Sequence, residues 1–123
     1  MNATLRAQRA YAAGAAPTRT EKGLEYEVIA RITYKLRTAA AQKETAFAAF
    51  AEALNDNRRL WQLLASDVAN DGNQLPAPLR ARIFYLAEFT FTHTRKVMAR
   101  KDDVQALIDI NTAIMRGLNP RKP

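Results

Sequence analysis

The sequence predicts a small all-α protein, and three observations support that prediction. Alanine, leucine, lysine, arginine, glutamate and glutamine, the strongest helix formers, fill most positions, whereas glycine occurs only four times in 123 residues. Apolar residues recur at helical spacing along most of the chain. Proline and glycine mostly fall between these periodic stretches. The length suggests one domain, 1–123, and we expect a helical bundle of about five helices.

The first two expected helices lie before residue 43. Residues 1–16 predict a short N-terminal helix that ends at Gly14 and Pro17, and its thin apolar face means that it can be mobile. Residues 21–42 predict a longer helix with an apolar stripe on one side. That stripe consists of Leu24, Val28, Ile32, Leu36 and Ala39.

The middle of the chain predicts two helical segments. Apolar spacing supports a helix over 43–54 and a new one carrying apolar residues from 60 to 68. Between them, Asn-Asp-Asn at 55–57 favours a helix end or kink, because these side chains bond to their own backbone. Asn-Asp-Gly at 70–72 then predicts the end of the second segment.

Two more helices follow a proline-containing turn at 73–78. Residues 78–100 predict a helix, although the alternating stretch 89–94 is a strand signal. Helix is favoured because the spacing on both sides is helical and a single strand would lack a partner. Asp102, with Gln105 three residues later, predicts a capping box at the start of the last helix, which Gly117 and Pro120 end. Residues 119–123 are expected to be a C-terminal tail.

The composition argues against several classes of function. The absence of cysteine excludes disulfides and thiolate metal sites, and a lone histidine cannot form a histidine metal cluster, so no metal or cofactor is expected. No phosphate-binding glycine loop, metalloprotease motif or nucleophile elbow occurs, so no catalytic residues and no enzyme activity are expected. No convincing targeting or membrane-spanning segment is present, which predicts no membrane insertion and favours the cytoplasm.

The net charge of +7, from 19 basic and 12 acidic residues, has two interpretations. A basic surface can bind nucleic acid or an acidic partner. Because the charges are spread out and no dense basic run occurs, a basic surface without such a role is favoured. The same holds for the basic residues of the helix over 78–100. These are Arg80, Arg82, Arg95 and Lys96, with Arg100 and Lys101 after them.

A few single residues are informative. Asn111 interrupts an apolar stripe, which favours a core asparagine bonded to a neighbouring turn over one that meets a partner's helix. Trp61, beside Arg58 and Arg59, has the composition of a binding hot spot, but core packing is the commoner role of a sole tryptophan on an apolar stripe. His93 has no nucleophile or carboxylate at helical spacing and is expected to be a partly buried or surface histidine.

Four short motifs occur in order along the chain. They are Asn-Arg-Arg-Leu-Trp at 57–61, Asn-Gln-Leu-Pro at 73–76, Leu-Arg-Ala-Arg-Ile at 79–83, and Ile-Asn through Gly-Leu at 110–118. With them the chain resembles, over nearly its whole length, the FlaF family of flagellar biosynthesis regulators of alphaproteobacteria. The resemblance implies a set of signature positions, which are candidate partner-binding or motif residues. These are Asn57, Arg58, Leu60, Trp61, Asn73, Leu75, Pro76, Arg80, Asn111 and Gly117.

The resemblance also implies a function and partners. FlaF-like proteins are small cytoplasmic helical proteins linked to flagellin production and export, alongside a second regulator, FlbT. The favoured hypothesis is a secretion-chaperone-like protein that binds the amphipathic terminal helices of flagellin in a helix-in-groove manner. Two alternatives stay open: an RNA-binding post-transcriptional regulator of flagellin, and an adaptor that acts through FlbT.

Overall fold

The computed structural model describes residues 21–118, which form four helices. They are α2 (Glu21–Ala40), α3 (Phe47–Ala69), α4 (Ala77–Met98) and α5 (Gln105–Leu118). The all-helical class is confirmed, with four helices in the described part of the chain where about five were expected for the whole. The helix expected at 1–16 and the tail expected at 119–123 lie outside the described residues.

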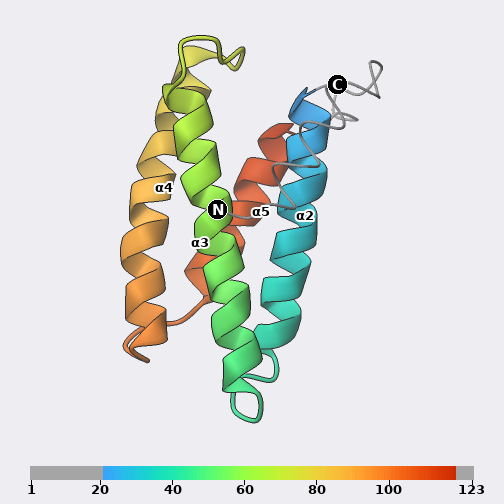
Figure 1. Ribbon diagram of the computed structural model, residues 1–123, viewed down its shortest axis with the longest axis vertical. Helices are drawn as coiled ribbons and strands as arrows, with labels where there is room; N and C mark the ends of the chain where they lie inside the picture. The colour runs from blue at the N-terminus through green and yellow to red at the C-terminus, as the bar shows by residue number, and fades with distance from the viewer. Residues whose placement is uncertain (1–20, 119–123) are drawn as a thin grey trace.

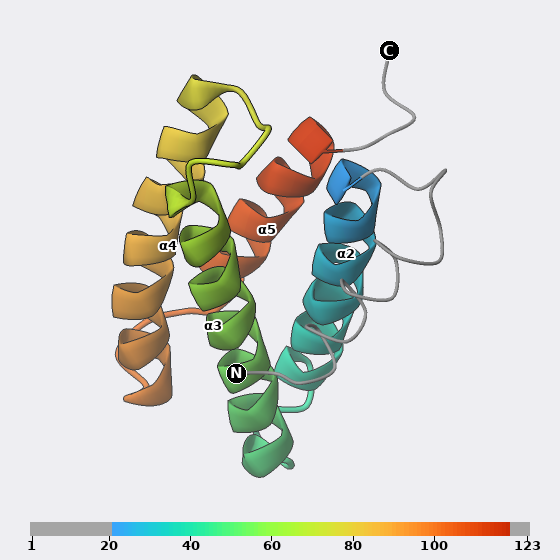
Figure 2. The ribbon, with the colours of Figure 1, turned by 45° about the horizontal axis from the view of Figure 1, so that its top comes forward.

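The helices form a bundle in which α3 occupies a central position. Helix α3 packs against α2 on one side and α4 on the other, while α5 packs against α2 and less extensively against α4. Figures 1 and 2 show α4 at one edge, α3 beside it and α2 at the opposite edge. Because α2 does not cover α4, a large part of the surface of α4 stays exposed.

The helix break expected at 55–57 is wrong. Helix α3 continues from Phe47 to Ala69 without interruption. Each of the three polar side chains has a partner other than its own backbone: Asn55 accepts from the arginine three residues on at 2.8 Å, Asp56 from a lysine of α2 at 2.6 Å, and Asn57 from an asparagine of α5 at 2.8 Å. These contacts remove the competition that makes such residues end helices.

The other helix boundaries follow the sequence prediction within a few residues. The alternating stretch 89–94 is helical, as expected. Helix α4 ends in a pair of hydrogen bonds typical of a Schellman motif, with Arg100 at φ 61° in the position that glycine usually occupies. The expected capping box of α5 is wrong in detail, because Gln105 donates its side-chain N–H to Asp109 and its backbone N–H to Asp103.

Two hydrophobic clusters fill the interior, one towards each end of the bundle. The first contains Val28, Ile29, Ile32, Leu60, Trp61, Leu64, Val68, Ile83, Ala87 and Ile114. The second contains Leu36, Phe50, Ala53, Leu54, Val97, Val104, Leu107 and Ile108. All four helices contribute to both clusters, the second also drawing on the loop before α5, and burial of apolar area of this kind is the main favourable term in folding.

A layer of buried polar residues separates the two clusters. On each helix, the polar residue stands between members of the first cluster and members of the second. The layer consists of Thr33 on α2, Asn57 on α3, Thr90 and Thr94 on α4, and Asn111 on α5. All five are at most 4% exposed, so the hydrogen bonds they make are shielded from water.

Candidate functional site: a groove between α3 and α4

Four of the ten signature residues lie in the interior. Asn111 links three helices: its Oδ1 accepts from Trp61 Nε1 at 2.9 Å, and its Nδ2 donates to Asn57 Oδ1 at 2.8 Å and to Thr33 Oγ1 at 3.0 Å. The Thr33 hydroxyl in turn donates to the Ile29 carbonyl at 2.6 Å. The core role expected for Trp61 and Asn111 is confirmed, although Asn111 bonds to helices and not to a turn. Leu60 is also buried, so these positions hold the fold together.

Four more signature residues build the turn between α3 and α4. Asn73 Oδ1 accepts from the Leu75 backbone N–H at 2.9 Å, and the Leu75 carbonyl accepts from Arg80 Nε at 3.0 Å. Pro76 precedes α4, and its carbonyl accepts from the Arg80 backbone N–H at 3.0 Å. Arg80 therefore connects the first turn of α4 to the loop, and its guanidinium has a structural task in this turn.

The last two signature residues differ from the rest. Gly117 is exposed in the last turn of α5, where an added Cβ would meet nothing within 4 Å, so the described structure gives no reason for a glycine there. Arg58 is half-buried on α3 and donates to the Asn55 side chain at 2.8 Å. It lines a surface groove, and it is the one signature residue that does so.

The groove lies between α3 and α4, towards the end where α3 begins and α4 ends. It encloses about 540 Å³. Its α3 wall consists of Ala51, Leu54, Asn55 and Arg58, and its α4 wall of Thr94, Arg95, Met98 and Ala99. Two alanines, a leucine and a methionine give the groove an apolar lining, and the two arginines stand on opposite walls.

An apolar stripe extends the groove along α4. Phe84, Phe91 and Met98 are spaced by seven residues, which places them on one face of the helix. Phe84 is 47% exposed and Met98 42% exposed, while Phe91 is partly buried. From Phe84 to Met98 the stripe covers fourteen residue steps, about 21 Å of helix. An exposed apolar row of this length is typical of a surface that binds another helix.

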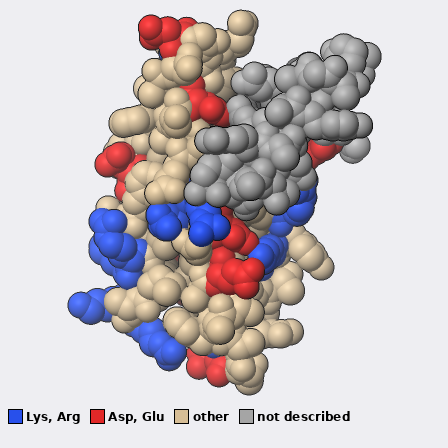
Figure 3. Space-filling model, viewed as in Figure 1, with Lys and Arg blue, Asp and Glu red and all other residues tan. Residues whose placement is uncertain are grey.

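The walls of the groove carry positive charge that the described residues do not neutralise. Arg58 and Arg95 have no ion pair within residues 21–118, while the nearby carboxylates of α3 face the other way. There, Lys35 on α2 lies 2.6 Å from Asp56 Oδ2 and 3.4 Å from Glu52 Oε2, and the Asp56 hydrogen bond raises the pKa of Lys35. Figure 3 shows lysine and arginine side chains gathered over the C-terminal half of α4 and the adjoining part of α3.

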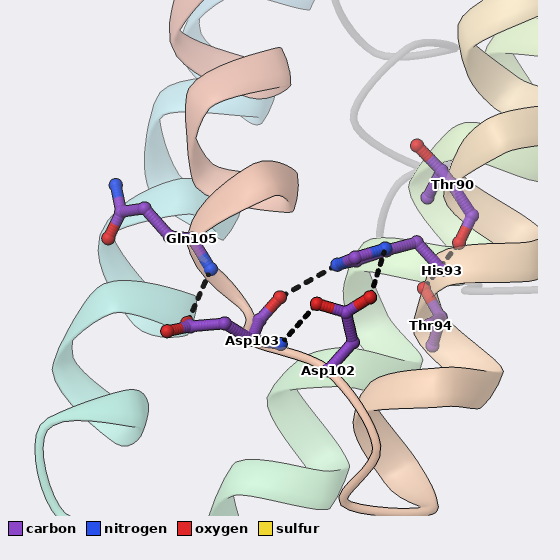
Figure 4. Close-up of polar contacts among 6 residues, drawn as sticks. All are labelled: Thr90, His93, Thr94, Asp102, Asp103 and Gln105. Carbon is purple, nitrogen blue, oxygen red and sulfur yellow. Dashed lines mark hydrogen bonds and ion pairs between the residues drawn. The ribbon is translucent and has the colours of Figure 1, made fainter.

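His93 lies on another face of α4 and has a structural environment. Its Nε2 is 2.7 Å from the Asp103 carbonyl, its Nδ1 is 3.9 Å from Asp102 Oδ2, and its ring stacks on Phe89 at 5.2 Å between centroids. Figure 4 shows the two ring nitrogens directed at these two aspartates of the loop before α5. With 7% exposure His93 is buried, more deeply than expected, and it ties α4 to the loop.

Two searches for other kinds of site gave negative findings. In residues 21–118, no group of three or more His, Asp or Glu side chains could hold a metal ion. Among the same residues, none of the helices has the length and apolar character needed to cross a membrane.

Comparison with known families identifies the relationship of this chain. The model of the flagellar protein FlaF family matches residues 7–118, nearly the whole chain. The chain belongs to the FlaF family. No curated protein and no solved structure matches it significantly. All four FlaF-like motifs of the sequence fall within the matched range, so the resemblance noted from the residues alone is confirmed at the level of the family.

Within this FlaF-family chain, sequence reasoning missed most of the groove. Of the eight residues that line it, only Arg58 is among the signature positions. Phe91, Thr94 and Met98 share the helical spacing of one apolar stripe on α4, yet Thr94 is buried and Met98 is substantially exposed. The available signal was the width of that stripe, because a helix that packs mainly against one neighbour buries only part of so broad an apolar face.

Proposed function

We propose that this FlaF-family protein binds flagellin and supports or couples its synthesis and export, in the manner of a secretion chaperone without catalytic activity of its own. Membership of a flagellar protein family is the observation on which the proposal rests. The flagellin terminal segments, as amphipathic helices that fold only on assembly, are the part of flagellin that we expect it to bind. Binding them in the cytoplasm would prevent premature polymerisation.

The surface of the protein supports this proposal. Several large apolar side chains stay exposed on the described helices. These are Tyr34, Phe84, Tyr85, Phe89 and Met98. Four of the five belong to α4, which packs against α3 and less extensively against α5 and leaves the rest of its surface exposed. An apolar helix surface of this kind suits a client whose own helices have an unpaired apolar face.

Copurification tests the proposal. The tagged full-length chain is mixed with monomeric flagellin from the same bacterium, and with flagellin lacking its terminal segments. We expect the intact flagellin to copurify and the truncated form to be lost. Equal capture of both forms would contradict binding to the terminal segments, and capture of neither would contradict flagellin binding altogether.

The basic surface makes RNA the main rival ligand, and a gel shift with the flagellin leader RNA at increasing salt separates the two. We expect weak binding that disappears near physiological salt, as for charge attraction alone. Tight and sequence-selective binding would favour the post-transcriptional regulator instead. Copurification of FlbT but not flagellin would favour the adaptor.

A further inference from the structure

We propose that the groove between α3 and α4 binds one amphipathic helix of about four turns, whose carboxylates flank its apolar face and pair with Arg58 and Arg95. This inference rests on the proposed function, since it takes flagellin to be the protein that supplies the helix. It adds a location, a length and a charge pattern, none of which family membership provides.

The shape of the site suits a helix. The groove has two helical walls, and each wall carries one small side chain, Ala51 on α3 and Ala99 at the end of α4. Small residues let another helix backbone approach closely, and the exposed Met98 side chain can pack between the side chains of that helix. The Phe84–Phe91–Met98 stripe continues the apolar surface for about 21 Å, the length of a fourteen-residue helix.

The charge of the site indicates what flanks that apolar face. Arg58 and Arg95 stand on opposite walls and have no ion pair within the described chain. The carboxylates Glu52 and Asp56 are engaged by Lys35 on the side of α3 that faces α2. A helix with acidic residues on both sides of its apolar stripe would complement the two guanidinium groups. The net charge of +7 would also speed its association with an acidic segment.

Substitutions in the groove test the location. Ala51→Trp fills the hollow, and the pair Arg58→Gln with Arg95→Gln removes its charge. Titration with monomeric flagellin should show that the Kd of the complex rises about tenfold or more for Ala51→Trp. For the double variant the Kd should rise about five- to tenfold, and its dependence on salt concentration should become shallower. Matched controls change the same chemistry elsewhere: Ala113→Trp at an exposed position of α5, and Arg31→Gln with Arg37→Gln on α2. These should stay within about twofold of the unaltered chain.

The outcomes separate this inference from the proposed function. If the unaltered chain binds flagellin and both groove variants bind equally well, the groove is not the site, while flagellin binding stands. If the unaltered chain does not bind flagellin, the proposed function fails and the assignment of the groove fails with it. Circular dichroism checks the folding of Ala51→Trp and of the double variant, which loses the Arg58–Asn55 hydrogen bond together with the two charges, so the test does not depend on one substitution.

The absence of cysteine allows a second test that identifies the occupant. Ala99→Cys places a single thiol in the α4 wall, where a photo-crosslinker can be attached, and Ala113→Cys is the control. Mass spectrometry of the product formed with flagellin should find a terminal segment with Asp or Glu beside apolar residues at helical spacing. Crosslinks to a second copy of this chain, or equal yields from both positions, would overturn the proposal.

Discussion

Two consecutive residues of α3, Asn57 and Arg58, face different surroundings. Asn57 is fully buried and bonds to α5, in the polar layer between the two hydrophobic clusters. Arg58 lines the groove beside α4, with its guanidinium group bonded only to Asn55 among the described residues. The two come from one sequence motif, at 57–61, yet one holds the helices together and the other lies on a surface that a partner can reach.

Most of the signature positions that the resemblance implies serve the fold of this chain. Eight of the ten signature positions lie in the interior or in the turn between α3 and α4, where each bonds or packs within the chain. Buried polar groups must be satisfied, which restricts the residue types allowed there. The exposed residues of the groove, such as Arg95 and Met98, are under no such restriction.

The largest expected loss of stability comes from removing the buried amide of α5 that bonds to α3. Asn111→Leu leaves Trp61 Nε1 and Asn57 Oδ1 buried without partners. Each such group costs about 1–3 kcal/mol, so we expect the free energy of unfolding to fall by about 4 kcal/mol. Urea unfolding followed by the fluorescence of Trp61, the sole tryptophan, measures this directly.

Two further variants serve as controls for Asn111→Leu. Ala113→Leu, at an exposed position of the same helix, should change stability by less than about 0.5 kcal/mol. Replacing Asn57 and Asn111 together by leucine should cost less than the sum of the single changes, because each residue is a partner of the other. A cost below about 1 kcal/mol for Asn111→Leu alone would mean that the polar layer does not carry the stability assigned to it.

An intermediate effect is expected in the turn that joins the two walls of the groove. Asn73→Ala removes the acceptor of the Leu75 N–H and should lower the free energy of unfolding by about 1 kcal/mol. Asn73→Asp keeps an acceptor oxygen at the same place and should lose much less. Chemical denaturation of both variants checks this, and equal losses would show that the oxygen is not what matters.

The smallest effect concerns the exposed link between α2 and α3. The hydrogen bond from Lys35 to Asp56 raises the pKa of Lys35 above its usual 10.5, so the link stabilises the fold below pH 10.5 and is lost as pH rises through the raised value. Since the Lys35 side chain is 46% exposed, Lys35→Met should cost under about 0.5 kcal/mol at pH 7.

Unfolding of this variant and of the unaltered chain from pH 7 to pH 11 measures the link. Lys96→Met is the control, because Lys96 is exposed and makes no ion pair with any residue of 21–118. The difference between Lys35→Met and the unaltered chain should shrink above pH 10.5. A difference that instead grew with pH would contradict the assigned direction of the pKa shift.

Local patterns in the sequence were enough to predict most of the helices. The periodic stretches at 21–42 and 78–100 became α2 and α4 with ends displaced by at most two residues, because amphipathic spacing and proline or glycine act within a few residues of the helix. The break expected at 55–57 failed because the partners of these residues include a lysine 21 positions earlier and an asparagine 54 positions later. No local rule contains such distant contacts.

The candidate site was less accessible to sequence reasoning. Arg58 belonged to a recognisable motif, and Trp61 and Asn111 were correctly expected to pack in the core. The groove depends on the relative placement of α3 and α4 and on the absence of α2 from that side. Ala51 and Ala99 matter because they are small, and an alanine in an alanine-rich chain gives no signal of its own.

The polar layer has a consequence for how the helices align during folding. If α5 were shifted by one turn along α2 and α3, Asn111 would enter one of the two hydrophobic clusters. Ile108 or Ile114 would then replace it beside Asn57. Neither mispaired state satisfies the buried amide, whereas two purely apolar halves would tolerate the slip more readily. The layer therefore favours a single register of α5 against α2 and α3.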